Sequence, residues 1–155
     1  MTMPDIPVLE TPRLVLRGPE AGDYPDFKAT FTSYRARFMG GPLNPYEAWM
    51  LYAAEIGHWQ IRGYGMWMIH DKATDETYGM AGGWKPAKWP EPEIAWVIWP
   101  EKSGRGFALE AVHAVGKVAV EITDEDNTRV GDLVSVPPAQ NALPAAAIDP
   151  TRRGL

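Results

Sequence analysis

The sequence contains no cysteine, which excludes a disulfide framework, a thiol nucleophile and a cysteine metal site. Only three histidines are present, His58, His70 and His113, and they share no metal-ligand spacing, so we expect no metal. No apolar run approaches the ~18 residues that a membrane-spanning helix needs. The first residues do not have the pattern of a signal peptide. These absences predict a cytoplasmic protein that has no membrane partner.

Positive charge is also scarce. The 15 Lys and Arg residues are outnumbered by 20 Asp and Glu residues, and the net charge of −5 disfavours non-specific binding to nucleic acid. A hydrophobic content of 45% and a charged content of 23% are ordinary for a soluble globular protein. The 155 residues suffice for one domain with a core of its own. The composition therefore leaves an enzyme or a binding domain.

What the sequence does contain is a strand, a glycine turn and a helix within residues 92–120. Residues 93–99 (EIAWVIW) predict a buried strand, which Pro100 ends because proline cannot donate to a sheet. After Gly104 and Gly106, an apolar helix face is formed by Ala108, Ala111, Val112, Val115, Ala119 and Ile122. Such a turn directs backbone N–H groups and the positive end of a helix dipole at one spot, which binds phosphate. We expect glycine there because a side chain would block close approach of an anion.

Three kinds of phosphate-binding loop can be compared with this stretch. A P-loop requires G-x-x-x-x-G-K-[ST], which is absent. A dinucleotide fingerprint requires a third glycine or alanine where Leu109 stands. The run EKSGRGFA at residues 101–108 instead resembles the acyl-CoA pyrophosphate loop, [Q/R]-x-x-G-x-[G/A], of the GNAT N-acetyltransferases. Glu101 is a departure, because that superfamily often has Gln or Arg at this position.

Three further runs extend the resemblance, two beside the glycine loop and one near the start of the sequence. The flanking runs EIAW and ALEA look like the E-I-G-W and A-T-E-A runs of the subfamily that includes the ribosomal-protein N-terminal acetyltransferases. The run LETPRLVLR at residues 9–17 is similar to the L-x-T-P-R-L-x-L-R opening of the same subfamily. The two matches lie in separate parts of the chain and support each other.

The remaining patterns predict an α/β fold with a mixed sheet, in the order β-α-α-β-β-β-α-β of the GNAT-like acyl-CoA N-acyltransferase core. Strands are predicted at residues 9–17, 66–70, 77–84, 93–99 and 129–136. Two earlier helices are predicted at residues 24–31 and 45–61, with Asp23 and Asn44 as their caps. Aromatic and apolar residues at helical spacing in the second helix predict packing in the core or at an interface, although the family's segment between the first two helices borders the acceptor site. These residues are Trp49, Tyr52, Ala53, Ile56 and Trp59. Glycines within 77–84 predict a bulge or a close approach of backbones.

The C-terminal residues depart from this pattern. We divide the chain into a GNAT-like acetyltransferase domain, residues 1–136, and an irregular proline-rich tail, residues 137–155, in which the family's last helix and hairpin are missing or irregular. Asn141 lies in a short run that resembles the start of that helix, and the resemblance implies a contact with the coenzyme there. The uncovered edge of the last strand favours a homodimer.

The resemblance implies that acetyl-CoA is the cosubstrate. Its pyrophosphate is expected on the backbone N–H groups of Ser103, Gly104, Arg105, Gly106 and Phe107. Its pantetheine arm is expected to pair with the backbone of Val97, Ile98 and Trp99, where an N–H group would also polarise the thioester carbonyl. The side chain of Arg105 either contacts a phosphate or is solvated.

Transfer to an amine also requires a base, because an alkyl ammonium is mostly protonated at neutral pH. Glu93 is the candidate, since members of the family often place a glutamate on this strand. Glu91 is a nearby competitor, and a solvated charge at a strand start is the alternative interpretation of Glu93. The tyrosine that the family frequently uses as general acid has no counterpart, because no tyrosine follows Tyr78.

Two functions are consistent with these residues. The first is an N-acetyltransferase that moves an acetyl group from acetyl-CoA to a primary amine by direct attack in a ternary complex. The alternative is a GNAT-like module that binds acyl-CoA or a partner chain with little or no turnover. The acceptor amine, a small molecule or a peptide, is left open by the sequence.

Overall fold

The computed structural model describes residues 5–119 of the 155-residue chain. The predicted strand at residues 129–136, the tail at 137–155 and Asn141 lie outside the described residues. The division into a domain and a tail at residue 136 therefore stays a prediction.

Five antiparallel strands form one sheet, and they are ordered in the sheet as they are in the chain. The strands are β1 (Leu9–Glu10), β2 (Leu14–Arg17), β3 (Met66–Asp71), β4 (Glu76–Trp84) and β5 (Glu93–Ile98). Within residues 5–119, β5 forms one edge of the sheet. The α/β class and the buried strand before the glycine loop are confirmed.

The prediction of one strand over residues 9–17 is wrong, because the chain turns between β1 and β2 to form a hairpin. The hydroxyl of Thr11 accepts a hydrogen bond from the N–H of Leu14 at 2.9 Å, and the N–H of Thr11 donates to the carbonyl of Leu14 at 2.9 Å. Pro12, which has no N–H and a fixed φ, follows directly and suits the turn. Leu14 and Leu16 are both fully buried on one face, as predicted.

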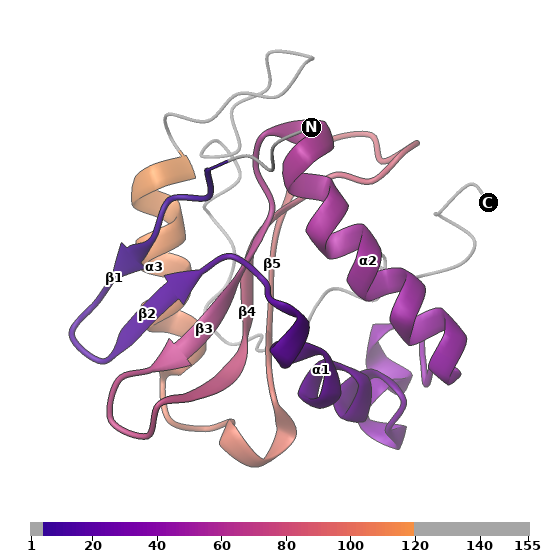
Figure 1. Ribbon diagram of the computed structural model, residues 1–155, viewed down its shortest axis with the longest axis horizontal. Helices are drawn as coiled ribbons and strands as arrows, with labels where there is room; N and C mark the ends of the chain where they lie inside the picture. The colour runs from indigo at the N-terminus through magenta and orange to yellow at the C-terminus, as the bar shows by residue number, and fades with distance from the viewer. Residues whose placement is uncertain (1–4, 120–155) are drawn as a thin grey trace.

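The helices cover both faces of the sheet (Figure 1). Helices α1 (Tyr24–Phe31) and α2 (Pro45–Arg62) lie on one face, and α3 (Phe107–Ala119) lies on the other. Short 3-10 turns are formed by η1 (Ala21–Asp23), η2 (Tyr34–Met39) and η3 (Pro100–Lys102). None of the helices within residues 5–119 has the length and apolar character that crossing a bilayer requires.

Two hydrophobic cores result from this arrangement, because successive strand residues face opposite sides of a sheet. The core beneath α1 and α2 takes Met66, Met68, Met80, Ala95 and Val97 from the sheet, and Trp99 from the residue after β5. The core beneath α3 takes Leu14, Leu16, Trp67, Ile69, Trp96 and Ile98. The residues of β5 after Glu93 are thus buried on both faces of the sheet, which explains why none of them is polar.

The helix starts differ in how they are capped. Asn44 caps α2 as predicted, since its side chain accepts from the N–H of Glu47 at 2.8 Å and Glu47 accepts from the N–H of Asn44 at 3.0 Å. Asp23 does not cap α1 through its side chain, so that prediction is wrong. Its carboxylate instead pairs with the guanidinium of Arg17 at 2.9 Å and accepts from the N–H of Glu20 at 2.9 Å.

The buried stripe of α2 is shifted from the predicted one. Trp49 and Ala53 are exposed, and the buried residues are Ala48, Tyr52, Glu55, His58 and Trp59. Large apolar residues occur on several sides of this helix, so their spacing alone does not identify the inward face. Tyr52 and Trp59 are buried as predicted.

Close backbone approach explains two glycines of β4, as predicted. A Cβ atom on Gly79 would lie 2.1 Å from the carbonyl oxygen of Val97, and one on Gly82 would lie 2.1 Å from that of Gly65. The register also shifts between Ile69 and His70 on the facing strand β3. Glycine lets β4 pass tightly between its two neighbours.

Candidate functional site

The glycine loop joins the end of β5 to the start of α3 through η3. Gly104 has a φ of +82° and Gly106 a φ of +79°, in the left-handed region that side chains disfavour. A Cβ atom on Gly104 would meet no atom within 4 Å. Glycine is therefore required by the backbone conformation itself, in addition to the close approach of an anion that the sequence predicts.

The glycine loop leads directly into the first turn of α3. Phe107 begins the helix directly after Gly106, and the first N–H groups of an α-helix have no acceptor within the helix. The peptide dipoles add a partial positive charge at this end. The N–H of Ser103 is turned back to the carbonyl of Pro100 at 3.5 Å, and its hydroxyl donates to the same oxygen at 3.0 Å. Residues 103–107 thus lie together at one helix start.

The pairing of β5 with β4 shows which backbone groups of β5 point away from the described sheet. The N–H of Trp99 donates to the carbonyl of Tyr78 at 2.7 Å, and the antiparallel register pairs Val97 with Met80. In such a ladder, alternate residues direct both backbone groups to the same neighbour. Trp99 and Val97 therefore face β4, whereas Ile98 and Trp96 direct their backbone groups to the edge that no described strand covers.

Glu93 lies at the first position of β5, opposite Trp84, and is half-buried. Its side chain belongs to the sheet face that Ala95 and Val97 present to α1 and α2. It stands three positions before Trp96, about 10 Å along a strand. Glu91 is exposed on the preceding loop.

A comparison with protein-family models identifies the chain. The model described as the acetyltransferase (GNAT) domain matches residues 13–142. The chain belongs to the GNAT acetyltransferase family. Because GNAT acetyltransferases use acetyl-CoA, the protein is an acetyl-CoA-dependent acetyltransferase. The resemblance found in the glycine loop is confirmed.

Solved structures give the same result for this GNAT protein. The acetyltransferase from Agrobacterium tumefaciens str. C58 is 33% identical with a TM-score of 0.70, over 76% of this chain and 68% of that one. A GNAT-family acetyltransferase from Bacillus anthracis shares the fold at 17% identity, with a TM-score of 0.60 over 74% and 67% of the two chains. A ribosomal L7/L12 alpha-N-protein acetyltransferase in complex with coenzyme A shares it at 17% identity, with a TM-score of 0.56 over 74% and 69%. No curated protein sequence matched the chain significantly.

The GNAT fold of this chain also buries a carboxyl group that the sequence patterns did not single out. Glu55 lies in the middle of α2, is only 2% exposed, and has no hydrogen-bond partner for either oxygen within the described residues. Burial raises the pKa of Glu55 well above its usual value. The sequence does carry a signal, because Glu55 follows Tyr52 by one turn and precedes Trp59 by another. Strongly perturbed buried groups are candidates for functional residues.

One turn further along α2, His58 is buried and fully paired. Its Nε2 accepts from the N–H of Lys85 at 2.9 Å, so its Nδ1 carries the proton and donates to the carbonyl of Tyr64 at 2.7 Å. Its ring stacks on Trp84 with centroids 4.9 Å apart. Burial lowers the pKa of His58 to about 4, so it is neutral at physiological pH. Residues 5–119 hold no cluster of three His, Asp or Glu side chains suited to a metal.

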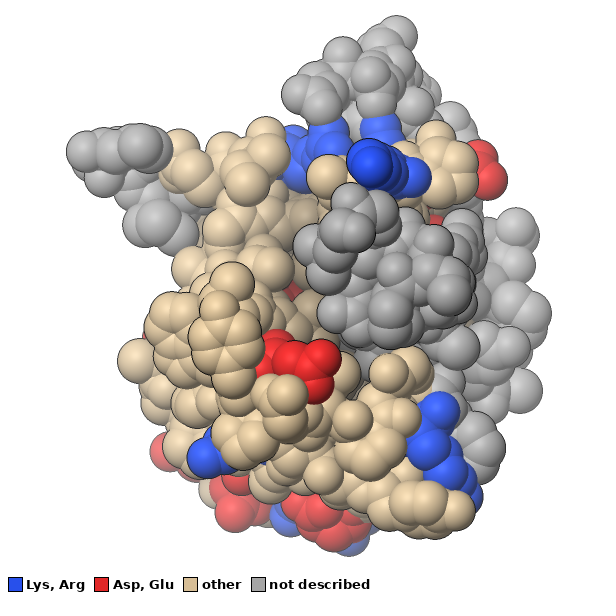
Figure 2. Space-filling view, turned by 90° about the vertical axis from the view of Figure 1, so that its right-hand side faces the viewer, with Lys and Arg blue, Asp and Glu red and all other residues tan. Residues whose placement is uncertain are grey.

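The outer surface near α2 is mostly uncharged, with acidic side chains at the centre of the view in Figure 2. Tyr46, Trp49 and Met50 are exposed near the start of this helix, and Trp49 is 56% exposed. The side of this GNAT domain that carries α2 therefore differs in character from the glycine loop, where the backbone provides the polar groups.

Proposed function

We propose that this protein transfers the acetyl group of acetyl-CoA to a primary amine by direct attack in a ternary complex. The observation that carries the proposal is the pair of left-handed glycines that opens α3, after a strand, β5, with one edge that no strand within residues 5–119 covers. One feature receives an anion and the other receives an extended amide chain, and coenzyme A combines the two.

In this proposal the pyrophosphate binds the backbone of residues 103–107, chiefly the N–H groups at the start of α3. The pantetheine amides pair with the backbone of Ile98 and Trp96, because Val97 and Trp99 face β4. One of these edge N–H groups donates to the thioester carbonyl oxygen and stabilises the negative charge that develops on it. Asn141 is proposed as a further coenzyme contact, on the resemblance alone.

The reaction begins with loss of a proton from the acceptor ammonium to the carboxylate of Glu93. A chain of water molecules relays the proton, since Glu93 lies about 10 Å along the strand from Trp96. The amine nitrogen then bonds to the thioester carbon, the carbon–sulfur bond breaks, and the thiolate leaves. The thiolate takes up the proton that the nitrogen releases, through solvent.

The acceptor is proposed to be a primary amine because GNAT acetyltransferases act on amine acceptors. A peptide N-terminus is the first class to test, since a neighbour of the same fold is named as a ribosomal L7/L12 alpha-N-protein acetyltransferase. Thiol release from acetyl-CoA is measured with peptides, amino acids and polyamines. Saturable coenzyme binding without thiol release for any amine would contradict the transferase proposal and favour a binding module.

The coenzyme site is tested by replacing Gly106 with valine. A β-branched residue strongly disfavours a φ of +79°, so the loop changes shape and coenzyme A binding is lost. Gly57→Ala is the matched control, because a Cβ atom there meets nothing within 4 Å on helix α2. Calorimetric titration with coenzyme A measures both. Equal affinity of Gly106→Val and the wild type would overturn the assignment of the loop.

A homodimer is also proposed, on the predicted strand at residues 129–136. Light scattering across a dilution series measures the molar mass. A monomer at every concentration, with full activity, would contradict this proposal.

A further inference from the structure

The side chain of Arg13 crosses from the β1–β2 turn to the glycine loop and the first turn of α3. Its Nη1 donates to the carbonyl oxygen of Arg105 at 3.0 Å, over a separation of 92 residues in sequence. Its Nε donates to Oε1 of Glu110 at 2.7 Å, and its backbone N–H donates to Oε2 at 3.0 Å. Its guanidinium carbon lies 4.4 Å from the centroid of the Phe107 ring. A single side chain thus contacts the loop, the first helical residue and the first helical turn.

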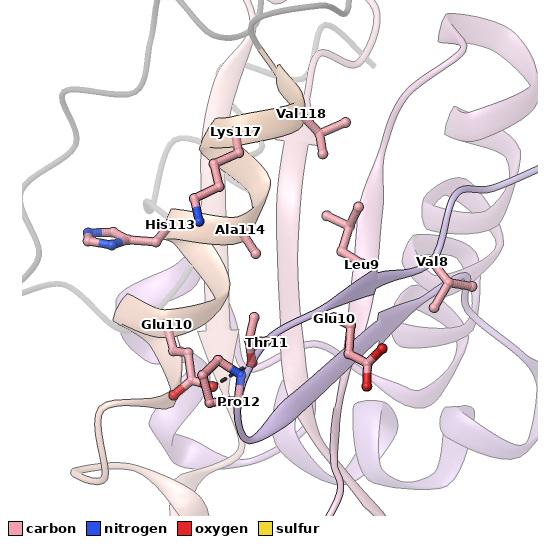
Figure 3. A pocket seen from close by; sticks show the side chains of 10 residues that line it. All are labelled: Val8, Leu9, Glu10, Thr11, Pro12, Glu110, His113, Ala114, Lys117 and Val118. Carbon is pink, nitrogen blue, oxygen red and sulfur yellow. Dashed lines mark hydrogen bonds between the residues drawn. The ribbon is translucent and has the colours of Figure 1, made fainter.

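Glu110 also accepts a hydrogen bond from a second residue of the β1–β2 turn. The hydroxyl of Thr11 donates to Oε2 of Glu110, and Figure 3 shows these two side chains next to each other in the lining of a pocket of about 480 Å³. Burial opposes ionisation of Glu110, but the hydrogen bonds from Thr11 and Arg13 outweigh it and lower the pKa of this carboxyl. Glu110 is therefore charged at neutral pH and anchors the guanidinium through a charge-assisted hydrogen bond.

The position of the Arg105 carbonyl oxygen determines the orientation of the peptide between Arg105 and Gly106. Arg105 stands between the two left-handed glycines, which have the greatest backbone freedom in the loop. In a planar trans peptide the C=O of one residue and the N–H of the next point in opposite directions. Fixing the oxygen of Arg105 therefore fixes the direction of the Gly106 N–H, away from the guanidinium.

We infer that Arg13 is a positioning residue, which holds the Arg105–Gly106 peptide plane so that the Gly106 N–H faces the pyrophosphate of the coenzyme. This inference rests on the proposed coenzyme site. Arg13 itself is not a phosphate ligand in this arrangement, because its guanidinium lies on the carbonyl side of the peptide. Its effect on binding is exerted through the loop.

The experiment compares two ligands that differ in the pyrophosphate. Arg13→Met keeps most of the aliphatic stem and removes the side-chain donors. Coenzyme A should bind this variant about tenfold more weakly by calorimetry, the loss expected when one strong hydrogen bond is misdirected. Pantetheine, which lacks the pyrophosphate, should bind the variant and the wild type equally in an NMR titration. Amide hydrogen exchange at Gly106 should become faster.

Two further variants separate positioning from a general loss of structure. Arg13→Lys retains a charged donor and should recover part of the coenzyme A affinity. Arg37→Met removes the same charge from an arginine that stacks on Tyr34 at 4.0 Å, and it should leave affinity unchanged. Equal coenzyme A affinity in Arg13→Met and the wild type would overturn the inference, as would equal losses for coenzyme A and pantetheine. Failure of the wild type to bind coenzyme A would instead overturn the proposed site, and the inference with it.

Discussion

Glu110 and Glu55 lie on helices that pack against opposite faces of one sheet, and the two carboxyl groups differ in their hydrogen bonding and in the direction of their pKa shifts. Glu110 accepts hydrogen bonds from Thr11 and from two N–H groups of Arg13, and its pKa is lowered. Glu55 is almost completely buried without a hydrogen bond in the described part of the chain, and its pKa is raised. The carboxyl group of Glu110 holds Arg13 against the glycine loop, whereas the carboxyl group of Glu55 lowers the stability of the folded state.

The difference indicates that the two faces of the sheet have different roles, one in holding the glycine loop and the other in retaining a buried ionisable group. A satisfied polar network rigidifies the elements that it joins, which suits a loop that we propose presents backbone N–H groups to the coenzyme. A buried carboxyl without a partner destabilises the folded state, and proteins retain such groups mainly where function requires them. The α2 face also contains His58, which is buried but paired. Four experiments test this division, in order of decreasing effect.

The largest effect is expected from acid, through His58. Its folded pKa of about 4 lies below the unfolded value of about 6.5, so its contribution to stability is present above pH 6.5 and is lost as the pH falls to 4. The loss is about 3 kcal/mol, because each tenfold difference in proton affinity between the folded and unfolded states corresponds to about 1.4 kcal/mol. Urea unfolding of the wild type and of His58→Gln across this range measures it. A constant difference between the two proteins would show that His58 does not titrate in this way.

The next effect concerns a third carboxylate, Glu93. Glu93→Gln should lower kcat about 100-fold and leave the affinity for coenzyme A unchanged, because only proton transfer is removed. The acidic limb of the pH–rate profile should also change. Glu91→Gln is the matched control, since Glu91 is exposed two residues away. Equal rates for the wild type and Glu93→Gln would assign the base elsewhere, and Glu55→Gln would then be assayed in the same way.

Removal of the buried carboxyl should stabilise the protein. Glu55→Leu should raise the free energy of unfolding at pH 7 by about 2 kcal/mol, because an unpaired polar group is replaced by an apolar one. The gain should shrink as the pH falls to 4.5, since the raised pKa makes Glu55 unfavourable only where the unfolded chain is ionised. Ala54→Leu, at an exposed position of α2, should change little. Destabilisation by Glu55→Leu would show that the carboxyl has a partner.

The smallest effect is expected on the opposite face. Glu110→Gln should lower the free energy of unfolding at pH 7 by about 1 kcal/mol, because it weakens the hydrogen bonds from Arg13 and Thr11. Its cost should diminish at pH 3, because the lowered pKa gives stability above pH 4.5 that is lost in acid. Urea titrations at both pH values measure this. A larger cost at pH 3 than at pH 7 would contradict the assigned ionisation.

Local patterns in the sequence are sufficient to predict much of the fold. The cap formed by Asn44 and Glu47, the buried strand β5 and the start of α3 each depend on residues within a few positions of one another. The turn at Thr11 is not predicted because apolar residues on both sides of it continue the strand pattern. The strand at residues 129–136 and the coenzyme contact of Asn141 stay predictions.

The polar contacts of the site are harder to predict. Arg13 and Glu110 are 97 residues apart, and neither shows by local pattern that it will meet the other. Glu55 is easily overlooked because its aromatic neighbours on α2 dominate the pattern. The role of Glu93 depends on its distance from a bound acceptor, which no spacing in the sequence supplies.

The contact between Arg13 and the carbonyl of Arg105 also has a consequence for how the chain folds. It closes a loop of 92 residues, and the entropy of closing a long loop must be met before such a contact can form. The β1–β2 hairpin leaves the ribosome early, but it must wait for the glycine loop to be synthesised and for the sheet between them to assemble. The proposed coenzyme site is therefore expected to form only after the elements between these two segments have assembled. Capture of coenzyme A by a nascent or refolding chain would report that its first and last described elements have met.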